Sequence, residues 1–145
     1  MHGLVQLVQQ DNEVFFYRDG KTASVAVRRD ASNRVAILTN GKPDAAIQMD
    51  PDRPPTSDEY TMVVAAALPL LMKPDATRYA NIGFGSGLTA ETLLSHSQPR
   101  EVDTVEIEPA IVSGARSYVP RVIRPYRDPR SNIVSLTPNH RERSH

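Results

Sequence analysis

Short runs of alternating apolar and polar residues, separated by turn dipeptides, fill the first third of the chain. Asp19-Gly20 and Asn40-Gly41 each follow such a run, and these dipeptides favour tight hairpin turns. An alternation of period two is typical of a strand with one buried face. We therefore expect residues 1–55 to form a small antiparallel β region with one face in the core. Its three predicted strands cover residues 14–18, 22–29 and 35–39.

A helix-capping pattern, Thr56-Ser57-Asp58-Glu59, opens the alanine-rich apolar segment that follows a polar, proline-rich loop. Thr56 suits the N-cap and Glu59 suits the third helical position, as in a capping box. The helix should run to about Leu68, because Pro69 is expected to kink or end it. The apolar run is shorter than the roughly 20 residues that cross a bilayer, so it predicts a buried helix.

From residue 78 onward the pattern changes to alternating strands and helices. This β-α-β-α-β order is typical of one half of a doubly wound parallel sheet, and residues 56–136 are predicted to form a partial Rossmann-like α/β domain. Residues 137–145 are polar, basic and aperiodic, which predicts a disordered or aberrant tail. The predicted strands are residues 78–82, 102–107 and 132–136, and the predicted helices are residues 88–96 and 109–118.

Composition narrows the range of partners. Lysine plus arginine equals aspartate plus glutamate at 17 each, so net charge gives no reason to expect nucleic acid or a membrane surface as partner. The chain has no cysteine, which excludes disulfides and thiolate metal sites and fits a reducing compartment such as the cytoplasm. The histidines show no ligand spacing, and we expect no metal site. The first residues lack the features of a secretory signal.

A glycine-rich turn between a predicted strand and a predicted helix is the strongest local signal for binding. Gly83, Gly85 and Gly87 form G-x-G-x-G, and glycine lets the backbone turn sharply and approach a ligand. The free N–H groups of the next helix point at the same place. The spacing differs from the dinucleotide motif G-x-G-x-x-G, which favours a nucleoside without phosphate. A plain strand-to-helix connection is the open alternative.

Acidic residues extend this candidate site. Glu106 ends the second predicted parallel strand about 20 residues after the turn, where a carboxylate can accept hydrogen bonds from ribose hydroxyls. Glu108 points the same way, but it precedes Pro109 and could instead cap the next helix, so we favour Glu106. Asp58 and Glu59 could contact a cationic amine, or they could serve only as helix-capping residues.

Several segments occur in the order NGKPDAA, TSDEY, NIGFGSGLTAETLL, VDTVEIEPAIV and DPRSNIV. In this order they resemble the spermidine synthase (polyamine aminopropyltransferase) family, in particular a divergent bacterial branch. The resemblance covers roughly residues 14–134. It implies an N-terminal β region that makes homodimer contacts and a Rossmann-like domain that binds decarboxylated S-adenosylmethionine as a substrate. It also implies transfer of an aminopropyl group to a polyamine.

The resemblance also assigns residues. Asp58 and Glu59 match an acidic pair that contacts the amine, whereas no residue matches the catalytic aspartate. The family has an aspartate at Ser86 and a tyrosine at Met62, and its pattern is lost after Val134, so we expect a truncated member that is incomplete catalytically. An S-adenosylmethionine-dependent methyltransferase-like domain and a non-catalytic dimerisation module are the alternatives. The implied nucleoside contacts are Gly83, Gly85, Ser86, Gly87, Glu106 and Ile107.

Overall fold

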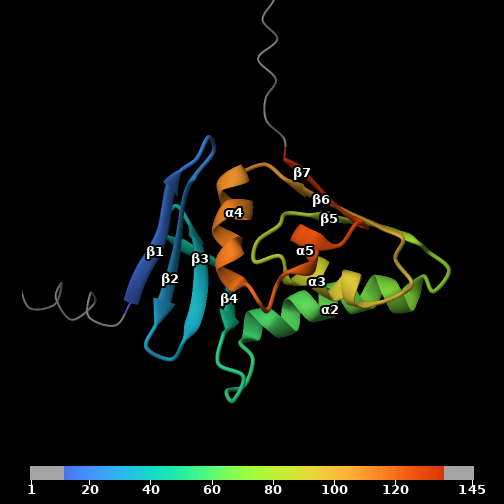
Figure 1. Cartoon of the computed structure of the whole chain (residues 1–145), viewed down its shortest axis with the longest axis horizontal. Coiled ribbons are helices and arrows are strands. Elements are labelled where there is room, and N and C mark those ends of the chain that lie inside the picture. The colour runs from blue at the N-terminus through green and yellow to red at the C-terminus, as the bar shows by residue number, and fades with distance from the viewer. Residues whose placement is uncertain (1–11, 136–145) are drawn as a thin grey trace, which may run out of the picture.

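The computed structural model describes residues 12–135 and contains two sheets. A four-stranded antiparallel sheet has the order β1-β2-β3-β4, and a three-stranded parallel sheet has the order β5-β6-β7. The antiparallel sheet lies at one end of the molecule and the parallel sheet with its helices lies at the other (Figure 1). The predicted α/β class, with an N-terminal antiparallel region and a partial Rossmann-like sheet, is confirmed. The tail predicted for residues 137–145 lies outside the described residues.

The antiparallel sheet has one strand more than the sequence predicts. Residues after Asn40-Gly41 were expected to form a loop, which is wrong for the segment that forms β4. Pro43 is tolerated there because β4 is an edge strand, where a missing N–H costs little, and Ala45 and Ile47 are buried on the core face. The strands are β1 (Asn12–Asp19), β2 (Ser24–Asp30), β3 (Arg34–Thr39) and β4 (Lys42–Gln48).

The long helix α2 (Ser57–Met72) joins the two sheets in sequence and begins at the predicted capping box. Thr56 Oγ1 accepts from Glu59 N at 3.3 Å, and Glu59 Oε2 accepts from Thr56 N at 2.9 Å. The expected end near Leu68 is wrong, because the helix continues through Pro69 for another turn. Proline removes only one backbone donor, and the buried side chain of Leu70 holds the last turn in place.

The second part of the chain alternates strands and helices as predicted. β5 pairs with β6 and β6 with β7, both in parallel. The 3₁₀-helix η1 replaces the last turn of a predicted helix, and α5 is a short helix that the sequence did not predict. The elements are β5 (Arg78–Ile82), α3 (Leu88–Ser95), β6 (Glu101–Glu106), α4 (Pro109–Gly114), η1 (Ala115–Tyr118), α5 (Arg124–Arg127) and β7 (Ser131–Ser135).

Two hydrophobic clusters hold these elements together. The smaller one joins α2 and α3 to the parallel sheet through residues such as Leu70, Leu94 and Val102. The larger one joins the antiparallel sheet to the segment that follows β6, and α4 lies between the two sheets (Figure 1). Tyr118 is fully buried in it, and its hydroxyl donates to Ala45 O at 3.1 Å. The antiparallel sheet therefore shares this core with α4 and η1.

Candidate functional site

The glycine turn forms a bend whose outer side is open. Gly83, Gly85 and Gly87 have φ angles of +85°, +53° and +82°, a region that favours glycine. A Cβ at Gly87 would lie 2.8 Å from the ring of Phe84, whereas a Cβ at Gly83 or Gly85 would meet no atom within 4 Å. Packing therefore requires Gly87 to be a glycine, while the other two leave free space beside the backbone.

Glu106 lies directly against this bend. Its Oε2 accepts from Phe84 N at 2.8 Å and its Oε1 accepts from Glu108 N at 2.9 Å. The side chain is only 4% exposed, so the carboxylate has a fixed position. The next residue, Ile107, is exposed and presents an apolar surface beside it. The structure thus brings together Glu106 and the glycine bend, which are 22 residues apart in the sequence.

Glu108 has the helix-capping role that the sequence offered as its alternative to ligand binding. It is the N-cap of α4, and its Oε1 accepts from Ala110 N at 3.0 Å. Its Oε2 accepts from Thr22 N at 2.8 Å and from Thr22 Oγ1 at 2.9 Å. Burial alone would raise the pKa of Glu108, but these hydrogen bonds outweigh it and lower the pKa below its usual value. Glu108 therefore holds the turn between β1 and β2 onto α4.

Ser86 faces inward from the bend. Its side chain is fully buried, and its hydroxyl lies 3.0 Å from the sulfur of Met62 on α2. The same oxygen accepts from Leu88 N at 3.3 Å. Two positions that depart from the spermidine synthase pattern, Ser86 and Met62, are thus in contact with each other. Any contact from Ser86 to a ligand on the open side would use its backbone.

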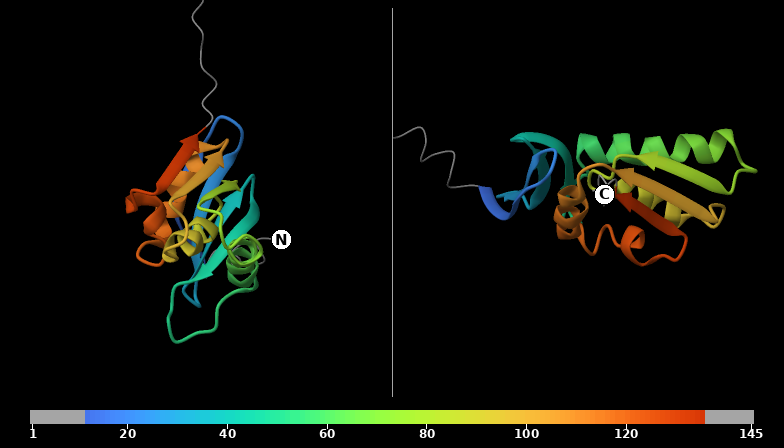
Figure 2. Two further views of the ribbon diagram at one scale, coloured as in Figure 1. Left: turned by 90° about the vertical axis from the view of Figure 1, so that its right-hand side faces the viewer. Right: turned by 90° about the horizontal axis from the view of Figure 1, so that it is seen from above.

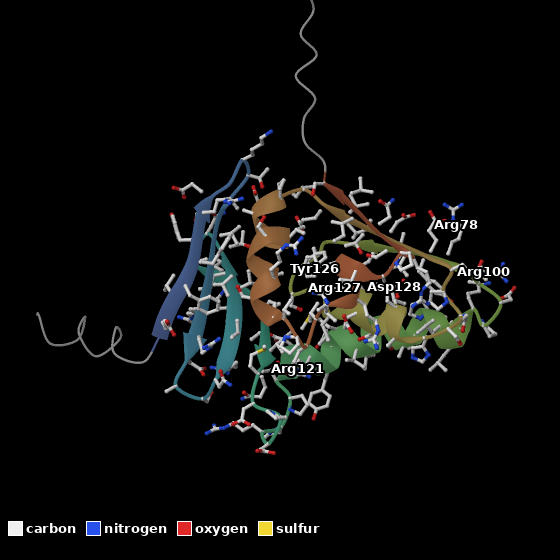
Figure 3. The ribbon with its side chains drawn as sticks, viewed as in Figure 1. Arg78, Arg100, Arg121, Tyr126, Arg127 and Asp128 are labelled. Carbon is white, nitrogen blue, oxygen red and sulfur yellow. The ribbon has the colours of Figure 1, made fainter. Side chains whose placement is uncertain are left out.

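Asp58 and Glu59 both bind the backbone of β4. Asp58 Oδ2 accepts from Ala46 N at 2.9 Å, and Glu59 Oε2 accepts from Gln48 N at 2.9 Å. Glu59 Oε1 also lies 2.6 Å from the guanidinium of Arg121, whose side chain reaches the N-terminal end of α2 (Figure 3). Within residues 12–135, no hydrogen bond joins Asp58 or Glu59 to Glu106.

Each acid of the pair lines a different hollow. Asp58 lines one of about 200 Å³ together with Arg28 and Arg34 from the antiparallel sheet. Glu59 lines one of about 180 Å³ that is otherwise largely apolar and includes Val63 and Leu88. The two acids of the predicted pair therefore lie at two separate hollows.

The segment from Arg116 to Tyr126 supports the bend from behind, and sequence reasoning missed it. The ring of Tyr126 packs against that of Phe84, with centroids 5.6 Å apart, and the guanidinium of Arg116 lies 4.4 Å from the Tyr126 centroid. Glu91 on α3 accepts from Ile123 N at 2.9 Å. Glu91 is itself buried, and its place among the apolar residues of a predicted helix was the only signal in the sequence for this burial.

Other kinds of site find no support in the described part of the chain. Residues 12–135 contain no group of three or more histidine, aspartate or glutamate side chains able to hold a metal ion. None of the helices within that range has the length and apolar character needed to span a membrane.

Comparison with known proteins identifies similar sequences and folds. No family model matches the sequence. A stretch of 67 residues, 46% of the chain, is 33% identical to spermidine synthase 2 of Arabidopsis thaliana and covers 20% of that protein. A solved spermidine synthase in complex with the transition state analogue AdoDATO matches with a TM-score of 0.71 and 19% identity over 84% of this chain and 40% of that one.

Two further solved structures agree with this result. Spermidine synthase from Thermotoga maritima matches with a TM-score of 0.71 and 18% identity, over 86% of this chain and 41% of that one. A probable spermidine synthase from Corynebacterium glutamicum matches with a TM-score of 0.60 and 18% identity, over 84% and 44% of the two chains. The chain therefore spans less than half the length of these relatives. The predicted resemblance to spermidine synthases is confirmed.

Proposed function

We propose that this spermidine-synthase-like chain binds the adenosine part of a sulfonium nucleoside, such as decarboxylated S-adenosylmethionine, at the glycine bend. Glu106 would accept hydrogen bonds from the ribose hydroxyls. The contact from Phe84 N to Glu106 Oε2 carries this proposal, because it holds a carboxylate at the open bend. Since the chain spans less than half the length of the solved relatives, aminopropyl transfer is proposed for the whole protein.

The chemistry of the bend suits a sugar and a flat base. Each carboxylate oxygen of Glu106 accepts one backbone hydrogen bond, and each has a second lone pair for a ribose hydroxyl. Hydrogen bonds to a charged acceptor contribute about 1.5–3 kcal/mol each. The absence of Cβ atoms at Gly83 and Gly85 leaves room for the sugar, and the exposed side chain of Ile107 offers an apolar surface to the base.

The reaction is a displacement at carbon. The amine nitrogen of the acceptor attacks the aminopropyl carbon next to the sulfonium, a new N–C bond forms, and the C–S bond breaks. The electron pair of the C–S bond stays on sulfur, so methylthioadenosine leaves as a neutral thioether. The acceptor nitrogen, which is an ammonium when free, must first lose a proton to a base so that its lone pair can attack. Alignment of nitrogen, carbon and sulfur accounts for much of the rate. No residue of this chain is assigned as the base.

The acceptor amine is a cation before it reacts, which is why acidic residues belong in this proposal. Asp58 and Glu59 are its predicted contacts. Glu59 already accepts from two backbone amides and pairs with Arg121. Asp58 makes one such bond, through Oδ2, but Arg28 and Arg34 line the same hollow and would compete with a cationic amine for its carboxylate. A homodimer through the antiparallel sheet and a cytoplasmic location also remain part of the proposal.

A second candidate is an S-adenosylmethionine-dependent methyltransferase-like function, favoured by one observation. Ser86 stands where the spermidine synthase pattern has an aspartate, and its hydroxyl is turned toward Met62. Because Ser86 is uncharged, this position has no carboxylate that would repel the carboxylate of S-adenosylmethionine. A preference for S-adenosylmethionine over its decarboxylated form would support this second candidate, and the opposite preference would support the first.

Calorimetric titration with methylthioadenosine, decarboxylated S-adenosylmethionine and S-adenosylmethionine tests the proposal. Glu106→Gln should weaken binding at least tenfold, because loss of one charged hydrogen bond of about 1.4 kcal/mol corresponds to that factor. Glu101→Gln is the matched control, since it lies at the other end of β6 and its carboxylate pairs with Arg78 at the surface. Circular dichroism would verify that each variant is folded.

A second variant separates ligand contact from folding. Gly85→Ala places a methyl group in the open space beside the bend and should reduce affinity more than stability, for which a strained φ costs about 1–3 kcal/mol. A folded Glu106→Gln protein with unchanged affinity would refute the assignment of Glu106. If the wild-type chain binds none of the three nucleosides, the non-catalytic dimerisation module would be the better account.

A further inference from the structure

Helix α2 is apolar on two opposite faces, and only one of them is covered. No charged residue occurs between Glu59 and Lys73. Ala66 and Leu70 are buried against α3 and the parallel sheet. A helix that is hydrophobic all round normally has neighbours on every side. The outer face of α2 nevertheless lies along the outside of the molecule, as the view from above shows (Figure 2).

The outer face consists of a ridge and a groove. Tyr60, Val64, Leu68 and Met72 follow one another at intervals of four residues, and each is more than half exposed. Such an i, i+4 row forms a continuous ridge along a helix. The neighbouring row contains the small exposed residues Ser57, Thr61 and Ala65. A row of small side chains beside a row of large ones leaves a groove that runs parallel to the ridge.

We propose that the outer face of α2 binds the same face of α2 in a second copy of this chain. In a two-fold pair, the ridge of each helix fits the groove of the other, which is the packing of i, i+4 ridges at a crossing angle near −50°. A patch that contains both a ridge and its matching groove is self-complementary, as a two-fold interface requires. The contact is separate from the antiparallel sheet and from the glycine bend.

The size and charge of the face fit this partner. The exposed parts of the ridge and groove side chains together amount to on the order of 600 Å² per copy, so the pair can bury at most about 1,200 Å², which corresponds to a small interface and a concentration-dependent dimer. The face brings no like charges together, because residues 60–72 carry none. An anionic membrane surface is a poorer partner, because helices that bind it carry a basic border, and the first turn of α2 is acidic.

Sedimentation of the whole chain at low and high concentration tests the proposal. The wild type should self-associate, and Leu68→Lys should halve the mass of the assembly by placing a charge in the contact. Ser95→Lys, at an exposed position at the end of α3, should leave the mass unchanged. A wild type that is monomeric throughout would overturn the proposal. So would an assembly whose mass Leu68→Lys leaves unchanged, since that result places the contact away from α2.

Cross-linking provides a test that does not depend on a disruptive variant. The natural chain has no cysteine, so Val64→Cys or Leu68→Cys introduces a single thiol. Under oxidising conditions the one of these positions that lies nearer the two-fold axis should give a covalent dimer, because only there does a residue meet its own copy and a disulfide requires Cβ atoms about 3.5–4.5 Å apart. Ser95→Cys, exposed at the end of α3, is the control. Equal yields from all three variants would contradict the proposed contact.

Nucleoside affinity provides an independent readout. Leu68→Lys should bind methylthioadenosine as tightly as the wild type, because the outer face of α2 is not part of the glycine bend. A failure of the dimer proposal would therefore leave the proposed nucleoside site untouched, and the reverse also holds.

Discussion

Glu59 has the contacts of a structural residue, and Glu59→Ala measures how much they contribute to stability. The carboxylate is 2% exposed. Its Oε2 accepts from the backbone of Gln48 and Thr56, each at 2.9 Å, and its Oε1 pairs with Arg121 at 2.6 Å. It therefore connects β4, the first turn of α2 and the loop before α5. The alanine variant removes all of these contacts at once.

The expected loss follows from the groups left without a partner. A buried donor that loses its acceptor costs about 1–3 kcal/mol, and breaking a buried ion pair costs about 3–5 kcal/mol. The contributions overlap because they share one carboxylate, and Arg121 is exposed enough to regain water. We therefore expect Glu59→Ala to lower the free energy of unfolding by about 4 kcal/mol, a large part of the 5–15 kcal/mol that is usual for a domain.

Urea unfolding followed by circular dichroism would measure this loss. Glu101→Ala is the matched control, because Glu101 pairs with Arg78 at 2.7 Å on the surface, and an exposed pair contributes about 0–1 kcal/mol. Equal losses for the two variants would refute the structural role of Glu59. If Glu59→Ala kept full stability and lost affinity for an amine, the residue would be a substrate contact instead.

Two further substitutions test buried polar groups. The pKa of Glu108 is lowered because hydrogen bonds from Thr22 and Ala110 outweigh the effect of burial, so its stabilisation is present above the unfolded pKa of about 4.3 and is lost as the pH falls below it. Glu108→Gln should therefore be less stable than the wild type at neutral pH, and the difference in the free energy of unfolding should be smaller in acid. If urea unfolding gave the same difference between variant and wild type at both pH values, this reasoning would be wrong. The hydroxyl of Thr104 is buried and has no hydrogen-bond partner among residues 12–135, so Thr104→Val should raise the free energy of unfolding by about 1 kcal/mol. A lower thermal midpoint for that variant would show that the hydroxyl is satisfied.

Local features were predictable because they depend on residues close in sequence. The capping box joins Thr56 to Glu59 within one helical turn, and the same local logic makes Glu108 the N-cap of α4. Positive φ angles at the glycine turn follow from the lack of a Cβ. The alternation of strands and helices after residue 78 follows from hydrophobic periodicity.

Local rules failed where burial elsewhere in the chain compensated for an unfavourable residue. Pro69 did not end α2, because Leu70 packs in the core. Pro43 did not prevent β4, because it lies on an edge strand whose later residues Ala45 and Ile47 complete the core of the antiparallel sheet. The prediction for α2 considered the cost of Pro69 and left out the apolar area that its neighbour Leu70 buries.

The sequence by itself determined most of the elements, their order and the residue types at the bend, but not β4 or α5. Only the tertiary structure decided which of the acids meet which partners. Glu106 reaches Phe84 across 22 residues, and Glu59 reaches Arg121 from a different element. The physical reason is that hydrogen bonds and ion pairs between distant residues require the packing of whole elements first, and that packing depends on all of their buried surfaces together.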